Sequence, residues 1–179
     1  WDRISPDLTT NNPARQQQEK SGGITVDNSS AEMHTTIYSI SESPITAGQI
    51  WVGTDDGNVQ LTRDGGQSWA NVGKAMKLGP DVSIAWVGAS RHDPAVAYVA
   101  VDRHSFGDMA PYILKTADYG KSWTRLVGPA TPGVRGYAHV VKEDRLSPDI
   151  LFVGTEFGLF ISRDKGANWE EFRPGNFPA

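Results

Sequence analysis

The chain consists largely of short apolar runs separated by glycine, aspartate and proline turn signals. Runs such as 50–54, 97–101 and 151–155 are rich in valine and aromatic residues, and each is about as long as one β-strand. No convincing helical period accompanies them. The pattern therefore predicts an all-β protein.

The apolar runs fall into three units of four predicted strands each. In the first unit the strands are 35–41, 49–54, 58–63 and 68–72. In the second they are 82–89, 95–102, 112–116 and 122–127. In the third they are 137–142, 150–155, 159–162 and 168–172. Tandem four-stranded antiparallel units of about 45 residues are typical of β-propeller blades.

Each unit contains one octapeptide with the frame Ser/Thr-x-Asp-x-Gly-x-x-Trp, and successive aspartates are 54 and 46 residues apart. A motif that recurs at blade spacing indicates a structural repeat. The fixed positions are Thr62, Asp64, Gly66 and Trp69, then Thr116, Asp118, Gly120 and Trp123, then Ser162, Asp164, Gly166 and Trp169.

The octapeptide is interpreted as the turn between the third and outermost strands. Its glycine supplies a positive φ, its aspartate and hydroxyl accept hydrogen bonds from the turn, and its tryptophan covers the turn with apolar surface. A carboxylate repeated in every blade is spread around the rim and does not converge on one point. A catalytic or calcium-binding role for Asp64, Asp118 and Asp164 is therefore disfavoured.

Composition narrows the classes of function. A net charge of −4 gives no basic field for nucleic acid, and no apolar run approaches the roughly 20 residues of a membrane helix. Cysteine is absent, and the four histidines show no HxH or HExxH spacing. We expect no nucleic-acid partner, no membrane span, no cofactor and no metal site.

The octapeptides resemble the Asp-box, or BNR, repeats of sialidases, xyloglucanase-type glycoside hydrolases and the sortilin-type ten-bladed propeller. Further stretches resemble bacterial secreted proteins of the sortilin-like branch, which are often labelled glycosyl hydrolase. The stretches are 4–9, 21–24, 50–69, 98–104 and 151–160. The resemblance implies a secreted or periplasmic propeller protein of which this chain is an internal portion.

The predicted layout is one partial propeller over residues 1–179. Residues 1–4 align with 69–72 and 169–172, which predicts that 1–7 form the outer strand of a preceding blade. A long connection at 8–33 and blades at 34–73, 81–128 and 136–173 follow. Three blades subtend too little of a circle to close. The expected partners are therefore the remaining blades of a longer chain, or further copies that complete a ring.

The irregular segments are predicted to share one face. In a propeller the connection 8–33 and the insertion 103–111 both lie on the face opposite the octapeptides, and binding residues usually occupy such loops. The candidate ligand-binding residues there are Arg103, His104, Phe106, Asp108 and Phe157.

Two functions remain open for this face. The first is a binding scaffold for a peptide or a glycan. The second is a glycoside hydrolase, which needs two carboxyl groups roughly 5 to 10 Å apart, one of them with a raised pKa. The candidate acids are Asp55 or Asp56 with Asp102, and Glu156. All four also fit ordinary turn or strand-end positions, and the scaffold interpretation is preferred because the sequence singles out no pair.

Overall fold

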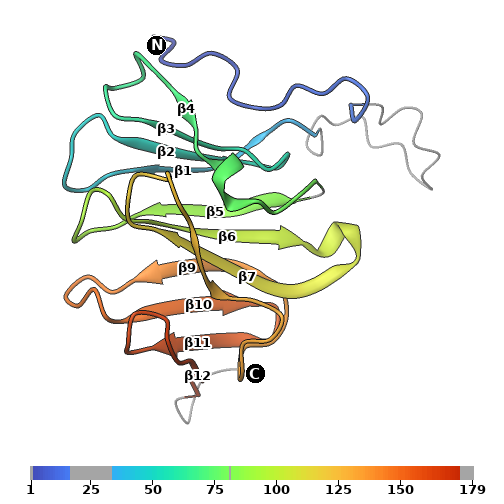
Figure 1. Ribbon diagram of the computed structural model, residues 1–179, viewed down its shortest axis with the longest axis vertical. Coiled ribbons are helices and arrows are strands. Elements are labelled where there is room, and N and C mark those ends of the chain that lie inside the picture. The colour runs from blue at the N-terminus through green and yellow to red at the C-terminus, as the bar shows by residue number, and fades with distance from the viewer. Residues whose placement is uncertain (1, 17–33, 81, 174–179) are drawn as a thin grey trace.

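The computed structural model describes residues 2–16, 34–80 and 82–173, and its fold is all-β as predicted. Three four-stranded antiparallel sheets follow one another along the longest axis (Figure 1). In each sheet the strands are ordered as in the chain, so every strand pairs with its sequence neighbour. In the described residues no helix is long and apolar enough to cross a membrane.

The strand bounds lie close to the predicted ones. The first blade contains β1 (Ile37–Glu42), β2 (Ile50–Thr54), β3 (Val59–Thr62) and β4 (Ala70–Asn71). The second contains β5 (Ser83–Ala89), β6 (Ala97–Arg103), β7 (Asp108–Thr116) and β8 (Thr124–Val127). The third contains β9 (Ala138–Glu143), β10 (Leu151–Thr155), β11 (Gly158–Ser162) and β12 (Glu170–Glu171).

Two predicted bounds are wrong for physical reasons. The outermost strands β4 and β12 keep only two residues each, because the octapeptide uses the residues before them. The insertion 103–111 is mostly strand, since Arg103 pairs with Asp108 and β7 begins there. Only a 3-10 turn, η3 (His104–Phe106), and Gly107 at φ 83° remain outside the ladder.

The core lies between the sheets. Strand β6 is in the middle sheet, and its residues from Ala97 to Val101 are at most 1% exposed because a neighbouring blade covers each face. This explains why the strand reads as a continuous apolar run without alternation. The innermost strands are linked as well: Ser39 Oγ and Ser41 Oγ accept hydrogen bonds from the backbone N–H groups of Val87 and Ala89.

The three octapeptides form the same hydrogen bonds. In the second, Asp118 Oδ1 accepts from Ser122 N at 2.9 Å and from Thr116 Oγ1 at 2.8 Å, while Gly120 N donates to Thr116 Oγ1 at 2.8 Å. The first and third repeat these contacts, with Asn168 in place of the serine in the third. Hydrogen bonds from Ser122 lower the pKa of Asp118 to about 2.

Two of the three tryptophans also contact the preceding segment of chain. Trp123 Nε1 donates to the Val72 carbonyl at 3.1 Å, and Trp69 Nε1 donates to the Ile4 carbonyl at 3.0 Å. The Ile4 carbonyl therefore makes the same contact with the first octapeptide that the Val72 carbonyl, after β4, makes with the second. This matches the sequence alignment of residues 1–4 with 69–72.

The prediction of a strand over residues 1–7 is nevertheless wrong for the described residues 2–7, which are irregular (Figure 1). No described strand offers them a backbone ladder. Side chains of the first blade hold the segment instead: Asn58 Nδ2 and Gln60 Nε2 both donate to the Leu8 carbonyl, and Leu8 is buried. Residue 1 and residues 17–33 of the predicted connection lie outside the described residues.

Candidate binding site on the loop face

The two ends of each sheet carry different connections. The second-to-third-strand turns and the connections between blades lie at one end, which we call the loop face (right side of Figure 1). The octapeptides and the first-to-second-strand turns lie at the other end, which we call the octapeptide face. There Gly65 N donates to the Gly48 carbonyl at 2.9 Å. Strand order places the predicted site residues at the loop face: Asp55, Asp56, Asp102, Arg103, His104, Phe106, Asp108, Glu156 and Phe157.

Asp55 fastens the chain around the first blade. Its Oδ1 accepts hydrogen bonds from the backbone N–H groups of Thr35 and Thr36 at 2.9 and 2.7 Å. Its backbone carbonyl accepts from Ser83 Oγ at 2.6 Å, which joins the first blade to the second. The Asp55 carboxylate is thus engaged within the protein.

Asp56 holds the segment that precedes the blades. Its Oδ2 accepts from the backbone N and the hydroxyl of Thr10 at 2.6 and 2.7 Å. Its Oδ1 accepts from Thr54 Oγ1 at 2.5 Å. The Asp56 carboxylate therefore links the segment around Thr10 to the end of strand β2.

Asp102 and His104 form a pair at the end of β6. His104 Nδ1 lies 2.6 Å from Asp102 Oδ2, and His104 N donates to Asp102 Oδ1 at 2.8 Å. The imidazole stacks on Tyr137 of the next blade, with ring centroids 4.5 Å apart and an interplanar angle of 17°. The stacking of His104 on Tyr137 therefore connects the second blade to the third.

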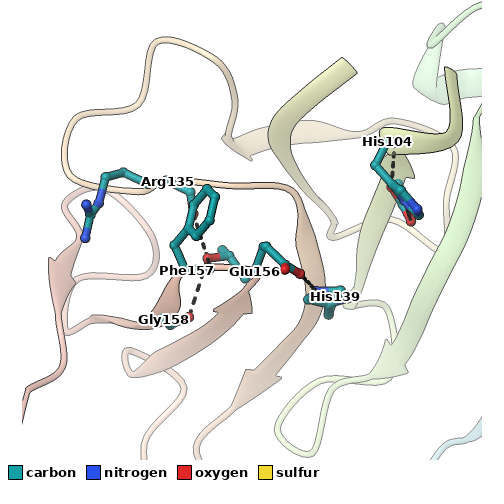
Figure 2. Close-up of polar contacts among 8 residues, drawn as sticks. His104, Arg135, His139, Glu156, Phe157 and Gly158 are labelled. Atoms are coloured by element: carbon teal, nitrogen blue, oxygen red, sulfur yellow. Dashed lines mark hydrogen bonds and ion pairs between the residues drawn. The ribbon is translucent and has the colours of Figure 1, made fainter. Parts of the chain in front are cut away.

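Glu156 completes this group from the third blade. His139 Nε2 lies 3.3 Å from Glu156 Oε2, and the two side chains point toward one another in Figure 2. Hydrogen bonds from Tyr137 and His139 lower the pKa of Glu156, and the carboxylate in turn raises the pKa of the Tyr137 phenol. We call Asp102, His104, Tyr137, His139 and Glu156 the loop-face cluster.

The loop-face cluster holds Glu156 as a carboxylate. A general acid of a glycoside hydrolase needs the opposite shift, toward a raised pKa. The chemistry that the cluster offers is hydrogen bonding by two carboxyl groups, a phenol and two imidazoles at a partly open surface.

Arg103, Asp108 and Tyr112 form a second polar group at the base of the insertion. Asp108 Oδ2 accepts from the Tyr112 hydroxyl at 2.8 Å and lies 3.5 Å from Arg103 Nη1. Hydrogen bonds from the Ala110 backbone and from Tyr112 lower the pKa of Asp108. These contacts fix the base of the insertion, and η3 lies at its tip.

The loop face carries a hollow of about 250 Å³ where the first two blades meet the N-terminal segment. Phe106 from η3 forms part of its wall, beside polar groups of residues 10–15. The full lining is Thr10, Asn12, Arg15, His34, Asp56, Pro80, Val82 and Phe106. Both polar and apolar groups are therefore open to a ligand here.

Exposed apolar side chains flank this hollow and the loop-face cluster. Phe106 is 43% exposed, Met109 58% and Phe157 62%. Phe157 lies against Gly136, where an added Cβ would come within 2.7 Å of the ring, so a glycine is needed to seat it. Figure 2 shows Phe157 beside Glu156 in the same turn.

Sequence reasoning missed Tyr137 and His139 as members of this site. The available signal was their spacing of two residues at the start of a predicted innermost strand, which places both on one side of it. The structure does not bring the predicted residues to one point. Asp55 and Asp56 join the first blade to the second blade and to the N-terminal segment. Asp102 and Glu156 lie where the second blade meets the third. In the described ranges no three His, Asp or Glu side chains are placed to hold a metal ion.

The three sheets and their connections define a protein of the β-propeller class, and the comparisons with known proteins agree. No protein-family model and no curated protein sequence matches the chain. Among solved structures, YCF48 bound to a D1 peptide superposes with a TM-score of 0.57 at 24% identity, over 76% of this chain and 40% of that one.

Two further solved structures extend the comparison. YCF48 from Cyanidioschyzon merolae gives a TM-score of 0.56 at 23% identity, over 75% of this chain and 39% of that one. A GH74 xyloglucanase from Xanthomonas campestris gives 0.55 at 16% identity, over 80% of this chain and 24% of that one. The chain spans at most 40% of the length of these proteins. At these identities the likeness establishes the fold.

Proposed function

We propose that this chain is part of a β-propeller scaffold that binds a peptide through its loop face. The observation that carries the proposal is the hollow of about 250 Å³ beside Phe106. It combines apolar walls from Phe106, Pro80 and Val82 with hydroxyl, amide, imidazole and carboxylate groups. Such mixed pockets suit the side chains and backbone of a peptide.

A peptide is favoured over a glycan by the state of the aromatic rings. Sugars are usually bound by stacking on an open ring face, but Tyr137 already stacks on His104 and meets His139 edge-on at 4.8 Å. Phe157 has one side seated against Gly136. A peptide ligand is also present in one of the similar propellers, YCF48 bound to a D1 peptide.

The glycoside hydrolase alternative has less support from the contacts. Asp55, Asp56, Asp102 and Glu156 each accept hydrogen bonds from groups of this chain, and the pKa of Glu156 is lowered. None of these contacts prepares a neutral carboxylic acid for protonating a leaving group.

The test is a binding screen of the full 179-residue chain against an immobilised random peptide library and a glycan array. We expect peptide hits whose affinity falls about tenfold or more in Phe106→Ala, because anchoring aromatics dominate such contacts. The matched control is Leu146→Ala, which removes an apolar side chain that is 93% exposed on the octapeptide face. This control should bind as the parent chain does.

Three outcomes would contradict the proposal. They are glycan hits without peptide hits, peptide binding that is lost in Leu146→Ala but kept in Phe106→Ala, and release of reducing ends from a polysaccharide panel. In the last case, loss of release in Asp55→Asn or Asp102→Asn would establish the hydrolase.

We further propose that the three blades work within a larger ring, formed by other blades or by further copies. The support is the open face of the first blade, where Tyr38 and Ile40 are 62% and 66% exposed on an innermost strand. Exposed apolar groups of this kind mark contact surfaces. A monomeric mass for the folded chain by light scattering would exclude the ring of copies and leave the other blades as the occupant.

A further inference from the structure

A second hollow, of about 140 Å³, lies where the innermost strands of all three blades end at the octapeptide face. Its volume is several times the roughly 30 Å³ that one water molecule takes in the liquid. It is separate from the loop face, because β1, β5 and β9 run from one face to the other. Its lining is Ser41, Glu42, Pro44, Trp86, Gly88, Ala89, Arg91, Tyr98, Lys142 and Glu143.

An indole forms the floor of this hollow. The six-membered ring of Trp86 lies against Gly88, two residues further along β5, and a Cβ at Gly88 would come within 1.8 Å of the ring. The glycine is therefore required for this placement of the ring. Lys142 Nζ lies 4.3 Å from the centre of the Trp86 ring, in cation–π contact.

A network of hydrogen bonds around Glu143 forms one wall of the hollow. Glu143 Oε2 accepts from Ser90 Oγ at 2.7 Å and from Arg91 N at 3.0 Å, and its Oε1 accepts from the Tyr98 hydroxyl at 2.9 Å. Ser90 and Tyr98 are each 1% exposed. The Glu143 carboxylate is thus committed to the wall.

Two cations with exposed side chains, Lys142 and Arg91, line this hollow. Neither Lys142 nor the Arg91 guanidinium forms an ion pair with a described residue. Desolvation and the charge of Arg91 lower the pKa of Lys142. The charged groups that face Lys142 are Arg91, Glu143 and, from the first blade, Glu42.

We propose that this hollow binds a small anionic group, a carboxylate or a phosphate, held by Lys142 and Arg91 above the Trp86 indole. An anion there satisfies two unpaired cations at once and uses charge-assisted hydrogen bonds, which are about twice as strong as neutral ones. Glu42 and Glu143 oppose binding, since each adds a negative charge to the same hollow. The site goes beyond the proposed peptide binding and shares no residue with it.

The test is NMR of the ¹⁵N-labelled full chain, titrated with sodium phosphate and, separately, with sodium acetate at constant ionic strength. The Trp86 indole resonance is assigned by its absence in Trp86→Phe. We expect a saturable shift of this resonance with half-saturation on the order of millimolar. The Trp123 indole, bonded to Val72, should not shift. A stronger response to one of the two anions identifies the group that natural ligands carry.

Variants make the test specific. Lys142→Met and Arg91→Gln should each weaken binding about tenfold, and Glu42→Gln should tighten it several-fold. The matched control is Lys115→Met, which removes a lysine 5.4 Å from the Tyr98 ring and outside the hollow. It should leave binding unchanged. An unshifted Trp123 resonance in each variant shows that the blades are intact.

An independent readout is the pKa of Lys142, followed by the ¹³Cε shift. A bound anion favours the charged lysine, so saturating phosphate or acetate should raise this pKa. The proposal is overturned if neither anion gives a saturable shift of Trp86. It is also overturned if the affinity is unchanged in Lys142→Met, or if sodium chloride alone reproduces the shift.

Discussion

The octapeptide face and the loop face both carry acidic residues in turns, but these residues make different kinds of contact on the two faces. On the octapeptide face, Asp64, Asp118 and Asp164 make the same contacts in all three blades. On the loop face the turns share a backbone bond, since Asp55 N and Glu156 N both donate to the chain before an innermost strand. Their side chains diverge: Asp55 accepts from the backbone N–H groups of Thr35 and Thr36, whereas Glu156 contacts the His139 imidazole. The contacts therefore repeat from blade to blade on the octapeptide face and differ from blade to blade on the loop face.

The largest expected effect is at an octapeptide glycine. Gly120 has φ 79°, and an added Cβ would lie 2.6 Å from Val72 Cβ. Gly120→Ala should therefore lower the free energy of unfolding by about 3 kcal/mol, through backbone strain plus overpacking. The matched control is Gly65→Ala, where φ is 71° but no atom lies within 4 Å, and the expected cost is about 1 kcal/mol. Urea denaturation measures both. Equal costs would show that contact between blades does not matter there.

The second largest effect is expected from acid, which should destabilise the octapeptide face. The folded-state pKa values of Asp64 and Asp118 are about 2, below the ordinary 3.8, because hydrogen bonds favour their carboxylates. Their stabilisation is therefore full above about pH 4 and is lost as the pH falls toward 2. Carboxyl ¹³C titration and thermal melts over this range measure it. Midpoints near 3.8 for both groups would contradict the proposed role of these bonds.

A smaller effect is expected in the loop-face cluster. The Glu156 carboxylate raises the pKa of Tyr137, so Glu156→Gln should bring that pKa down toward its usual value of 10.0. NMR titration of the Tyr137 ring measures the change. Asp149→Asn is the control, since Asp149 pairs with Lys165 on the octapeptide face and does not contact Tyr137. A Tyr137 pKa that is unchanged in Glu156→Gln would show that Glu156 does not act on Tyr137.

The smallest effect on stability is expected at Phe157. This side chain is 62% exposed, so Phe157→Ala should change the free energy of unfolding by no more than about 0.5 kcal/mol. The same variant should weaken binding of peptides selected on the parent chain. Chemical denaturation and a binding assay on one preparation separate the two effects. A large loss of stability would show that Phe157 contributes to the packing of the third blade.

Local signals made the blades predictable. The strands follow from apolar runs and turn residues, and the octapeptide places its glycine, aspartate and tryptophan within eight residues. The outermost strands and the insertion 103–111 were misjudged because ladder pairing, such as Arg103 with Asp108, is a contact between segments.

The loop-face cluster could not be derived from sequence in the same way. His104 and Tyr137 are far apart in the chain, and only packing of the second blade on the third stacks their rings. The hollow beside Phe106 likewise needs residues 10–15 to be folded back onto the first blade by Asp56. The sequence predicted His104 and Phe106 on this face but not Tyr137, and the contacts in both cases depend on the placement of whole blades.

The hydrogen bonds from Trp69 to Ile4 and from Trp123 to Val72 give the array a direction. The first and second octapeptides each use a carbonyl of the segment before them, whereas Trp169 donates to Gly166 within its own octapeptide. Loss of one unit should therefore destabilise the next, with an effect that weakens with distance, as in other one-dimensional arrays. Ile4 gives the first octapeptide the same kind of carbonyl contact that Val72, after β4, gives the second. Hydrogen exchange after removal of residues 2–8 should rise most in the first blade and least in the third.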